Sequence, residues 1–162
     1  MIGSFRARFK ARADGSIDFR IADEERALVG NLVEEMRELL MGTAATGEVD
    51  ASMRRLYPTA YPDDAERDAD YQALMRDELL ERRLEHLEQV EASLDLDRLE
   101  EHQAMAWVTV LNDARLVLGT KLDVSEEEDF SSLDPEDPQH HPRAIYHYLG
   151  HLQDEFLQVL TP

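Results

Sequence analysis

The segment from Trp107 to Gly119 constrains the fold most, because as a helix it is apolar around nearly its whole circumference. At about 100° per residue, one side centres on Leu111 and the opposite side is also apolar. A helix of this kind has to be covered by other elements. We therefore expect it at the centre of a helical domain. The side around Leu111 comprises Ala104, Trp107, Val108, Ala114 and Leu118, and the opposite side comprises Met105, Ala106, Val110, Leu116 and Val117.

An arginine, Arg115, lies inside this core-facing stripe, about 40° from its centre, and Asn112 lies on the flank. Because an unpaired charge in a core is costly, Arg115 requires partners. The last expected helix carries Gln153 in its own apolar stripe, near Gly150, where another segment can approach closely. We expect a buried network of Asn112, Arg115 and Gln153, completed by an acid or by backbone carbonyls. The favoured role is to fix helix register; the alternative is to hold a small anion or a partner's carboxylate.

The chain has 162 residues, a formal net charge of −19 and no cysteine. This length predicts a single domain over residues 1–162. The charge disfavours nucleic acids and anionic membranes as partners. The lack of cysteine excludes disulfides, thiolate catalysis and Cys-based zinc sites. No apolar run approaches the roughly 18 residues of a membrane span and no signal-peptide core is visible, so we expect a cytoplasmic protein.

Residues 5–21 alternate between apolar and polar side chains and predict a β-hairpin. A two-residue turn at Asp14-Gly15 would place the apolar residues of the two strands on opposite faces. A three-residue loop over 13–15, with Gly15 in the left-handed conformation, pairs Phe9 with Phe19 and keeps the faces matched. We expect the second arrangement. Because two strands alone are marginally stable, the apolar face should pack on helices.

Four helices are expected at about 23–41, 64–94, 97–118 and 142–160. Asp23 and Asp97 are expected at the beginnings of the first and third helices, and Gly42 and Gly119 at their ends. The apolar positions of the second helix shift by half a turn, which predicts a bend or a change of packing partner near residues 76–79.

The connections also have distinct compositions. Residues 42–51 are rich in small residues and predict a linker, and the two Tyr-Pro steps within 54–64 predict extended chain. Residues 123–141 are acidic and interrupted by prolines, which predicts a mobile loop. The expected fold is mainly α (α+β): a four-helix bundle-like domain with an N-terminal β-hairpin packed on it.

One face of the first strand is basic, through Arg6, Arg8, Lys10 and Arg12. These side chains either pair with the acidic helices and protect a strand edge, or form a docking edge for an acidic partner. On the last helix, His147, His151 and Glu155 recur every four residues, a spacing that can hold a metal. The trio lies on the face expected to be solvated and lacks the HExxH pattern, so we expect no metal site there.

Catalytic motifs are absent from the sequence. No GxSxG, GxxxxGK[ST] or GxGxxG is present, and acidic residues are too numerous for one pair to indicate an acid–base dyad. We therefore expect no catalytic residue, no cofactor and no enzyme activity.

Three segments carry a family resemblance: residues 55–64 (RLYPTAYPDD), 111–120 (LNDARLVLGT) and 148–153 (YLGHLQ). They resemble the signature segments of an actinobacterial family of unknown function, whose members are often encoded beside the Clp-protease adaptor ClpS. The resemblance implies a link to regulated proteolysis and places Arg115 at a signature position.

The leading hypothesis is a non-enzymatic regulatory or adaptor protein that acts by contact with protein partners, among them Clp protease components. We also expect a homodimer, formed through the flank Met105, Val110, Leu116 and Val117 if the chain itself leaves it uncovered. One alternative is a sensor that binds a small anion through Arg115, Asn112 and Gln153. The other is a metal-dependent enzyme that uses the C-terminal histidines.

Overall fold

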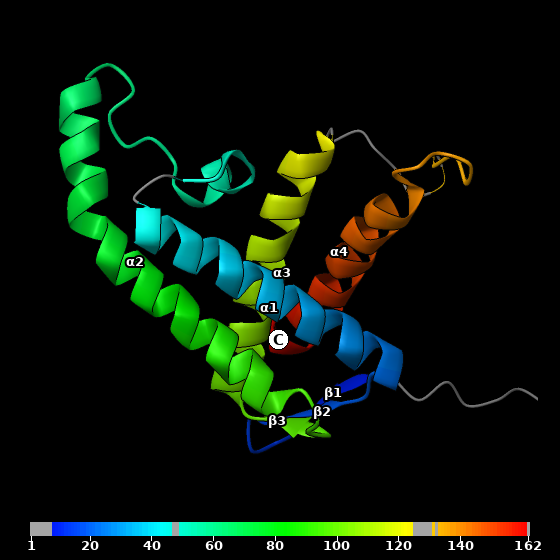
Figure 1. Cartoon of the computed structure of the whole chain (residues 1–162). Helices are drawn as coiled ribbons and strands as arrows, with labels where there is room; N and C mark the ends of the chain where they lie inside the picture. The colour runs from blue at the N-terminus through cyan, green and yellow to red at the C-terminus, as the bar shows by residue number, and fades with distance from the viewer. Residues whose placement is uncertain (1–7, 47–48, 125–130, 132, 162) are drawn as a thin grey trace, which may run out of the picture.

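The computed structural model describes residues 8–46, 49–124, 131 and 133–161, and it confirms the mainly α fold with an N-terminal hairpin. Figure 1 shows the small sheet at one end of the helical assembly. The helices are α1 (Asp23–Thr46), the 3-10 helix η1 (Ala51–Leu56), α2 (Ala65–Ser93), α3 (Glu101–Leu122) and α4 (His140–Leu160). The strands are β1 (Phe9–Ala11), β2 (Ile17–Phe19) and β3 (Arg98–Leu99).

The hairpin has the predicted register, with Phe9 opposite Phe19. Arg12 N–H donates to the Ser16 carbonyl at 2.8 Å, which closes a loop over residues 13–15. Gly15 has a φ of +89°, a conformation that side chains with a Cβ rarely adopt. Phe9 and Phe19 are buried and stack on each other, with ring centroids 5.5 Å apart. The apolar face of the hairpin therefore packs on the helical core, as expected.

A third strand was not predicted. In β3, Leu99 lies opposite Ile17 of β2, and the Asp97 carbonyl accepts a hydrogen bond from Phe19 N–H at 2.9 Å. The expectation that a helix opens at Asp97 is therefore wrong. The α3 helix begins at Glu101, where the Gln103 side chain accepts a hydrogen bond from Glu100 N–H at 2.9 Å. Pairing with β2 holds this segment extended, and helical periodicity carries no signal of such a long-range contact.

The expected glycine terminators are also wrong, since α1 continues past Gly42 to Thr46 and α3 past Gly119 to Leu122. Gly42 is exposed, where an interior glycine costs only about 1 kcal/mol. Gly119 serves packing, because a Cβ there would lie 3.1 Å from the Tyr146 ring. The predicted cap is wrong as well, because Asp23 is the first helical residue and Ala22 precedes it. There the Glu25 side chain reaches back and accepts a hydrogen bond from Ala22 N–H at 2.7 Å.

The α3 helix occupies the centre of the helical assembly, as its composition predicted. It packs against α2, α4 and η1, and Trp107 and Leu111 are almost fully buried. The Trp107 indole N–H donates to Ser93 Oγ of α2 at 2.8 Å. Because both groups are buried, this hydrogen bond fixes the end of α2 against α3.

The segment between α1 and α2 is only partly the predicted linker. Part of it forms η1, whose Met53 and Leu56 enter the core, while residues 47–48 lie outside the described chain. After η1, residues 57–64 run beside the start of α2, and Asp68 Oδ1 accepts hydrogen bonds from the N–H groups of Ala60 and Tyr61.

The two halves of α2 have different surroundings. The core residues of α2 lie in its C-terminal half, at Leu87, Val90 and Ser93, whereas residues 65–79 are exposed or half-buried. The helix also changes direction along its length in Figure 1. The change of direction agrees with the bend that was one of the two alternatives predicted for this helix.

Of the predicted acidic loop 123–141, residues 125–130 and 132 lie outside the described chain. Residues 135–139 form turns, and α4 begins at His140, two residues earlier than predicted, with Pro142 in its first turn. In the part of the chain that the structure covers, no helix combines the length and the apolar character that a membrane span requires.

Candidate functional site

Arg115 and Gln153 are brought together between α3 and α4. Arg115 Nη1 donates to Gln153 Oε1 at 2.8 Å, and the guanidinium lies over the Tyr146 ring, 5.3 Å from its centroid. A Cβ on Gly150 would lie 3.3 Å from this guanidinium, so the glycine makes room for the arginine. Two neighbouring side chains and the Gly150 backbone therefore occupy the space around Arg115.

Asn112 is not part of this contact. Its side chain is exposed, so the predicted network of three residues is a pair, Arg115 with Gln153. Asn112 lies about 100° around the helix from Leu111, which proved to be beyond the buried face. Within the described ranges, Arg115 has no ion pair, and its buried Nε has no hydrogen-bond partner. The charge is held by an amide oxygen and an aromatic face.

Asp113, the residue after Asn112, is mostly buried on the opposite side of α3, which the sequence analysis missed. Its carboxylate lies 3.9 Å from Arg83 Nε of α2, and each side chain is only 16% exposed. Burial raises the pKa of the Asp113 carboxyl, against the opposing effects of Arg83 and His86. Arg83 also donates to the Leu56 carbonyl at 2.6 Å. A signal was available, since Arg83 falls within the apolar stripe of its helix, beside Leu84.

The basic strand face is largely used within the chain. Arg8 pairs with Glu25 at 2.8 Å and with Glu155 at 3.3 Å. Arg12 pairs with Asp18 at 2.7 Å. Lys10 is exposed, and Arg6 lies outside the described residues. For Arg8 and Arg12 the ion pairs support the first interpretation, pairing with acidic side chains.

The histidine trio of α4 does not converge. His151 is exposed, the His147 ring packs edge-on against Tyr146, and Glu155 contacts Arg8. Across the ranges that the structure describes, no group of three His, Cys, Asp or Glu residues is placed to hold a metal ion.

The flank predicted for self-association is mostly covered by the chain itself. Val110 and Val117 are each only 4% exposed and Leu116 is half-buried, whereas Met105 is 49% exposed. That flank is therefore not available as a dimer surface, and Met105 alone remains exposed.

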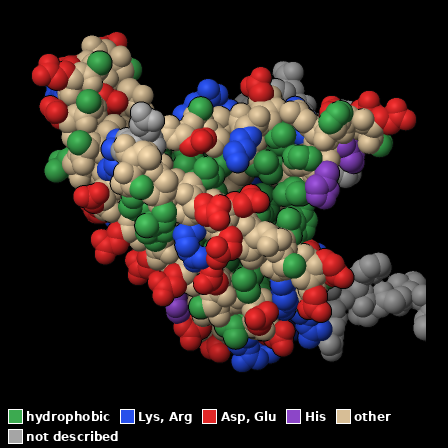
Figure 2. Space-filling view, viewed as in Figure 1, with side chains coloured by type: hydrophobic (Ala, Val, Ile, Leu, Met, Phe, Trp, Pro, Cys, Tyr) green, Lys and Arg blue, Asp and Glu red, His purple; other side chains and the backbone are tan. Residues whose placement is uncertain are grey.

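Several hollows mark the described part of the surface, and two of them adjoin α3. Figure 2 shows hydrophobic side chains gathered between α1, α3 and α4. A depression lined by Leu32, Leu39 and Leu118 has a volume of only about 40 Å³, well below that of a small-molecule site. The other hollow is an open groove of about 1040 Å³ between the hairpin turn, the C-terminal half of α2 and the start of α3. We call it the hairpin groove; its lining includes Asp14, His86, Glu100, Glu101 and Met105.

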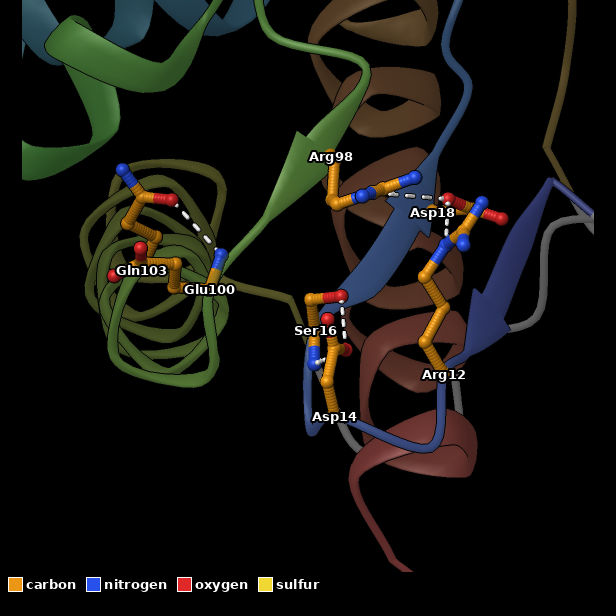
Figure 3. A network of polar contacts seen from close by, with 7 residues as sticks. All are labelled: Arg12, Asp14, Ser16, Asp18, Arg98, Glu100 and Gln103. Atoms are coloured by element: carbon orange, nitrogen blue, oxygen red, sulfur yellow. Dashed lines mark hydrogen bonds and ion pairs between the residues drawn. The ribbon is translucent and has the colours of Figure 1, made fainter.

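Hydrogen bonds hold the walls of the hairpin groove in place (Figure 3). Asp14 Oδ1 accepts from Ser16 N–H at 2.9 Å and from Ser16 Oγ at 2.5 Å. These bonds lower the pKa of the Asp14 carboxyl. On the neighbouring strand, Arg98 Nε lies 3.6 Å from Asp18 Oδ1. The turn and the strand are therefore ordered before any partner arrives, which reduces the entropy cost of binding.

The side chains at the mouth of the hairpin groove combine acidic and apolar character. Glu100 has a side chain 73% exposed, 3.3 Å from His102 Nδ1, and Glu101 is also exposed. Met105 follows one turn later on α3 and is 49% exposed. An exposed apolar side chain beside acidic groups is suited to recognition of a partner with matching character.

Comparison with known proteins identifies a family for this chain. No curated protein and no solved structure matches the chain. A family described as a domain of unknown function, DUF2017, matches residues 5–160, from the first strand to the end of α4. Because that match spans nearly the whole chain, the protein belongs to the DUF2017 family.

Proposed function

We propose that this protein is a non-enzymatic regulatory or adaptor protein that binds a protein partner through the hairpin groove. The observation that carries the proposal is the groove itself. It is open, its walls are ordered by internal hydrogen bonds, and it joins the exposed Met105 to the carboxylates of Glu100 and Glu101. A volume near 1040 Å³ is at the upper end of the range for small-molecule sites, and its openness suits a chain segment better.

The exposure of the polar groups in the groove supports a binding role rather than a catalytic one. Glu100 and His102 form an acid–base pair in the lining of the groove, and their side chains are 73% and 62% exposed. Acid–base catalysis gains from a site that excludes water, because electrostatic effects are then stronger. An exposed pair offers a partner charge and hydrogen bonds instead.

The proposed partner class is the Clp protease machinery. This part of the proposal is supported by the sequence resemblance alone, through residues 55–64, 111–120 and 148–153. It is separable from the adaptor role, because the hairpin groove can bind a partner of another kind.

Site-specific photo-crosslinking in the native host tests the proposal. A benzophenone amino acid replaces Met105 in the groove or, as the control, Met41 on α1, since both side chains are 49% exposed. We expect adducts with a discrete partner at position 105 and none at position 41. Equal labelling at both positions, or none at either, would contradict a binding role for the groove. Adducts that contain only two copies of this chain would replace the adaptor role with self-association.

Mass spectrometry of the position-105 adducts tests the partner class. A Clp component among them supports the link to regulated proteolysis. If the adducts contain discrete partners but no Clp component, the result contradicts the Clp link and still supports the adaptor role.

A further inference from the structure

We infer that the hairpin groove takes an extended segment of a partner protein in which a Lys or Arg stands two residues from an apolar side chain. This inference rests on the proposed function and specifies the chemistry of the partner.

The charges around the groove favour a positively charged group on the bound segment. Glu100 and Glu101 stand at the start of α3, and Asp14 lies on the hairpin turn across from them. Arg98 also lines the groove, and because its neighbour Asp18, 3.6 Å away, already pairs with Arg12 at 2.7 Å, Arg98 offsets one of these three carboxylates. The amino end of α3 contributes a partial positive charge of about one half, which two carboxylates outweigh. The uncompensated charge of the mouth is therefore negative.

The position of Glu101 places the cation at the edge of the groove where the helix meets the hairpin. Its Oε2 lies 4.0 Å from the point that a Cβ on Gly15 would occupy. The carboxylate thus lies against the turn at the edge of the groove, and an ammonium or guanidinium group that enters the groove beside it would contact Glu101 directly. Such a charge-assisted hydrogen bond is stronger than a neutral one.

The apolar requirement comes from Met105, which lies four residues after Glu101 on α3 and is 49% exposed. Four residues of helix advance by about 6 Å along the axis. In an extended segment, side chains two residues apart point to the same side and stand about 7 Å apart. A segment lying along α3 would therefore place a cation at Glu101 and an apolar side chain on Met105. The unbranched methionine can adapt to several apolar shapes.

Phage display of random eight-residue peptides against the full-length chain tests this inference. We expect the enriched peptides to carry a Lys or Arg two residues from an apolar side chain. Their enrichment should fall when the selection is repeated in high salt, because screening weakens the contact with Glu101. Enrichment of peptides that lack a cation, or no enrichment at all, would overturn the inference.

Matched substitutions then locate the binding. The affinity of an enriched, fluorescently labelled peptide is measured by anisotropy. Glu101→Lys should weaken it on the order of ten-fold, whereas Glu38→Lys, an equal change of charge at an exposed position of α1, should change it by less than about two-fold. Met105→Ser should weaken it, and the equally exposed Met41→Ser should not. Equal effects within either pair would place the binding elsewhere.

The two proposals fail in different ways. Discrete crosslinks at position 105, together with peptides that lack the cationic and apolar pattern, would leave the adaptor role standing and remove this inference. Absence of crosslinks would remove the adaptor role itself. Glu101→Gln, which removes one charge without adding another, is the second variant, and circular dichroism checks that each variant is folded.

Discussion

Arg115 and Gln153 form a partly buried hydrogen bond between α3 and α4. The Arg115 guanidinium donates to Gln153 Oε1, and Gln153 is only 8% exposed. Removing either side chain leaves a buried polar group without its partner, which costs about 1 to 3 kcal/mol. Replacing both side chains with apolar residues of similar size leaves no such group, and the cost then approaches zero.

We therefore predict a strongly non-additive pair. Arg115→Met and Gln153→Leu should each lower the free energy of unfolding by about 1 to 3 kcal/mol, and the double variant by less than the sum of the two. Urea denaturation of the four proteins measures this. Additive losses would show that the contact has no structural role, and a neutral Arg115→Met would favour a functional reason for the charge.

Sequence periodicity predicted part of this chemistry at the residue scale. It placed Arg115 and Gln153 on buried faces because each lies within an apolar stripe. It wrongly placed Asn112 at a buried position, because the border of a buried face depends on how the neighbouring helices pack against it. It missed Asp113 with Arg83, because that pair forms only where α2 and α3 meet.

At the scale of elements, the register of the hairpin is determined by its own local sequence. Its register follows from matching the apolar faces of the two strands, which requires a positive φ at Gly15. The space around that glycine is open, since the nearest atom to an added Cβ lies 4.0 Å away. Backbone strain is therefore the only cost of a side chain there.

We predict that Gly15→Ala lowers the free energy of unfolding by about 1 to 2 kcal/mol, the usual penalty for an L residue in the left-handed region. Ala13→Gly in the same loop is the control for loop flexibility and should cost less. Thermal unfolding followed by the fluorescence of the single tryptophan, Trp107, provides the measurement. A Gly15→Ala variant as stable as the parent would mean that the loop adopts another turn without cost.

Across the whole molecule, Glu25 joins three elements. It accepts hydrogen bonds from Ala22 N–H at the start of α1, from Arg8 beside the hairpin and from the Tyr148 hydroxyl of α4, the last two at 2.8 Å. Burial alone would raise the pKa of Glu25, but these three donors outweigh it, and the pKa lies below its ordinary value of 4.5. The ionised carboxylate is therefore stabilised by folding.

This shift predicts the dependence of stability on acid. A lowered pKa contributes stability above the ordinary value of 4.5, and that contribution is lost as the pH falls through the folded-state pKa. Glu25→Gln should lower the free energy of unfolding at pH 7 by about 1 to 2 kcal/mol and reduce its further loss between pH 5 and about 3. Glu24→Gln, at the exposed neighbouring position, is the control. Parallel stability curves for the parent and Glu25→Gln would contradict the assignment.

The sequence by itself determined the features that depend on short-range pattern. These are the helical class, the hairpin register and the central place of α3, because each follows from the period of apolar residues along one element. The tertiary structure decided what depends on contact between distant segments: the third strand, the true ends of α1 and α3, the burial of Asp113 and the hairpin groove. The groove arises only where the turn at Gly15, α2 and the start of α3 meet. No local pattern carries that information, because the turn at Gly15 is far along the chain from α2 and α3 and only packing brings it to them.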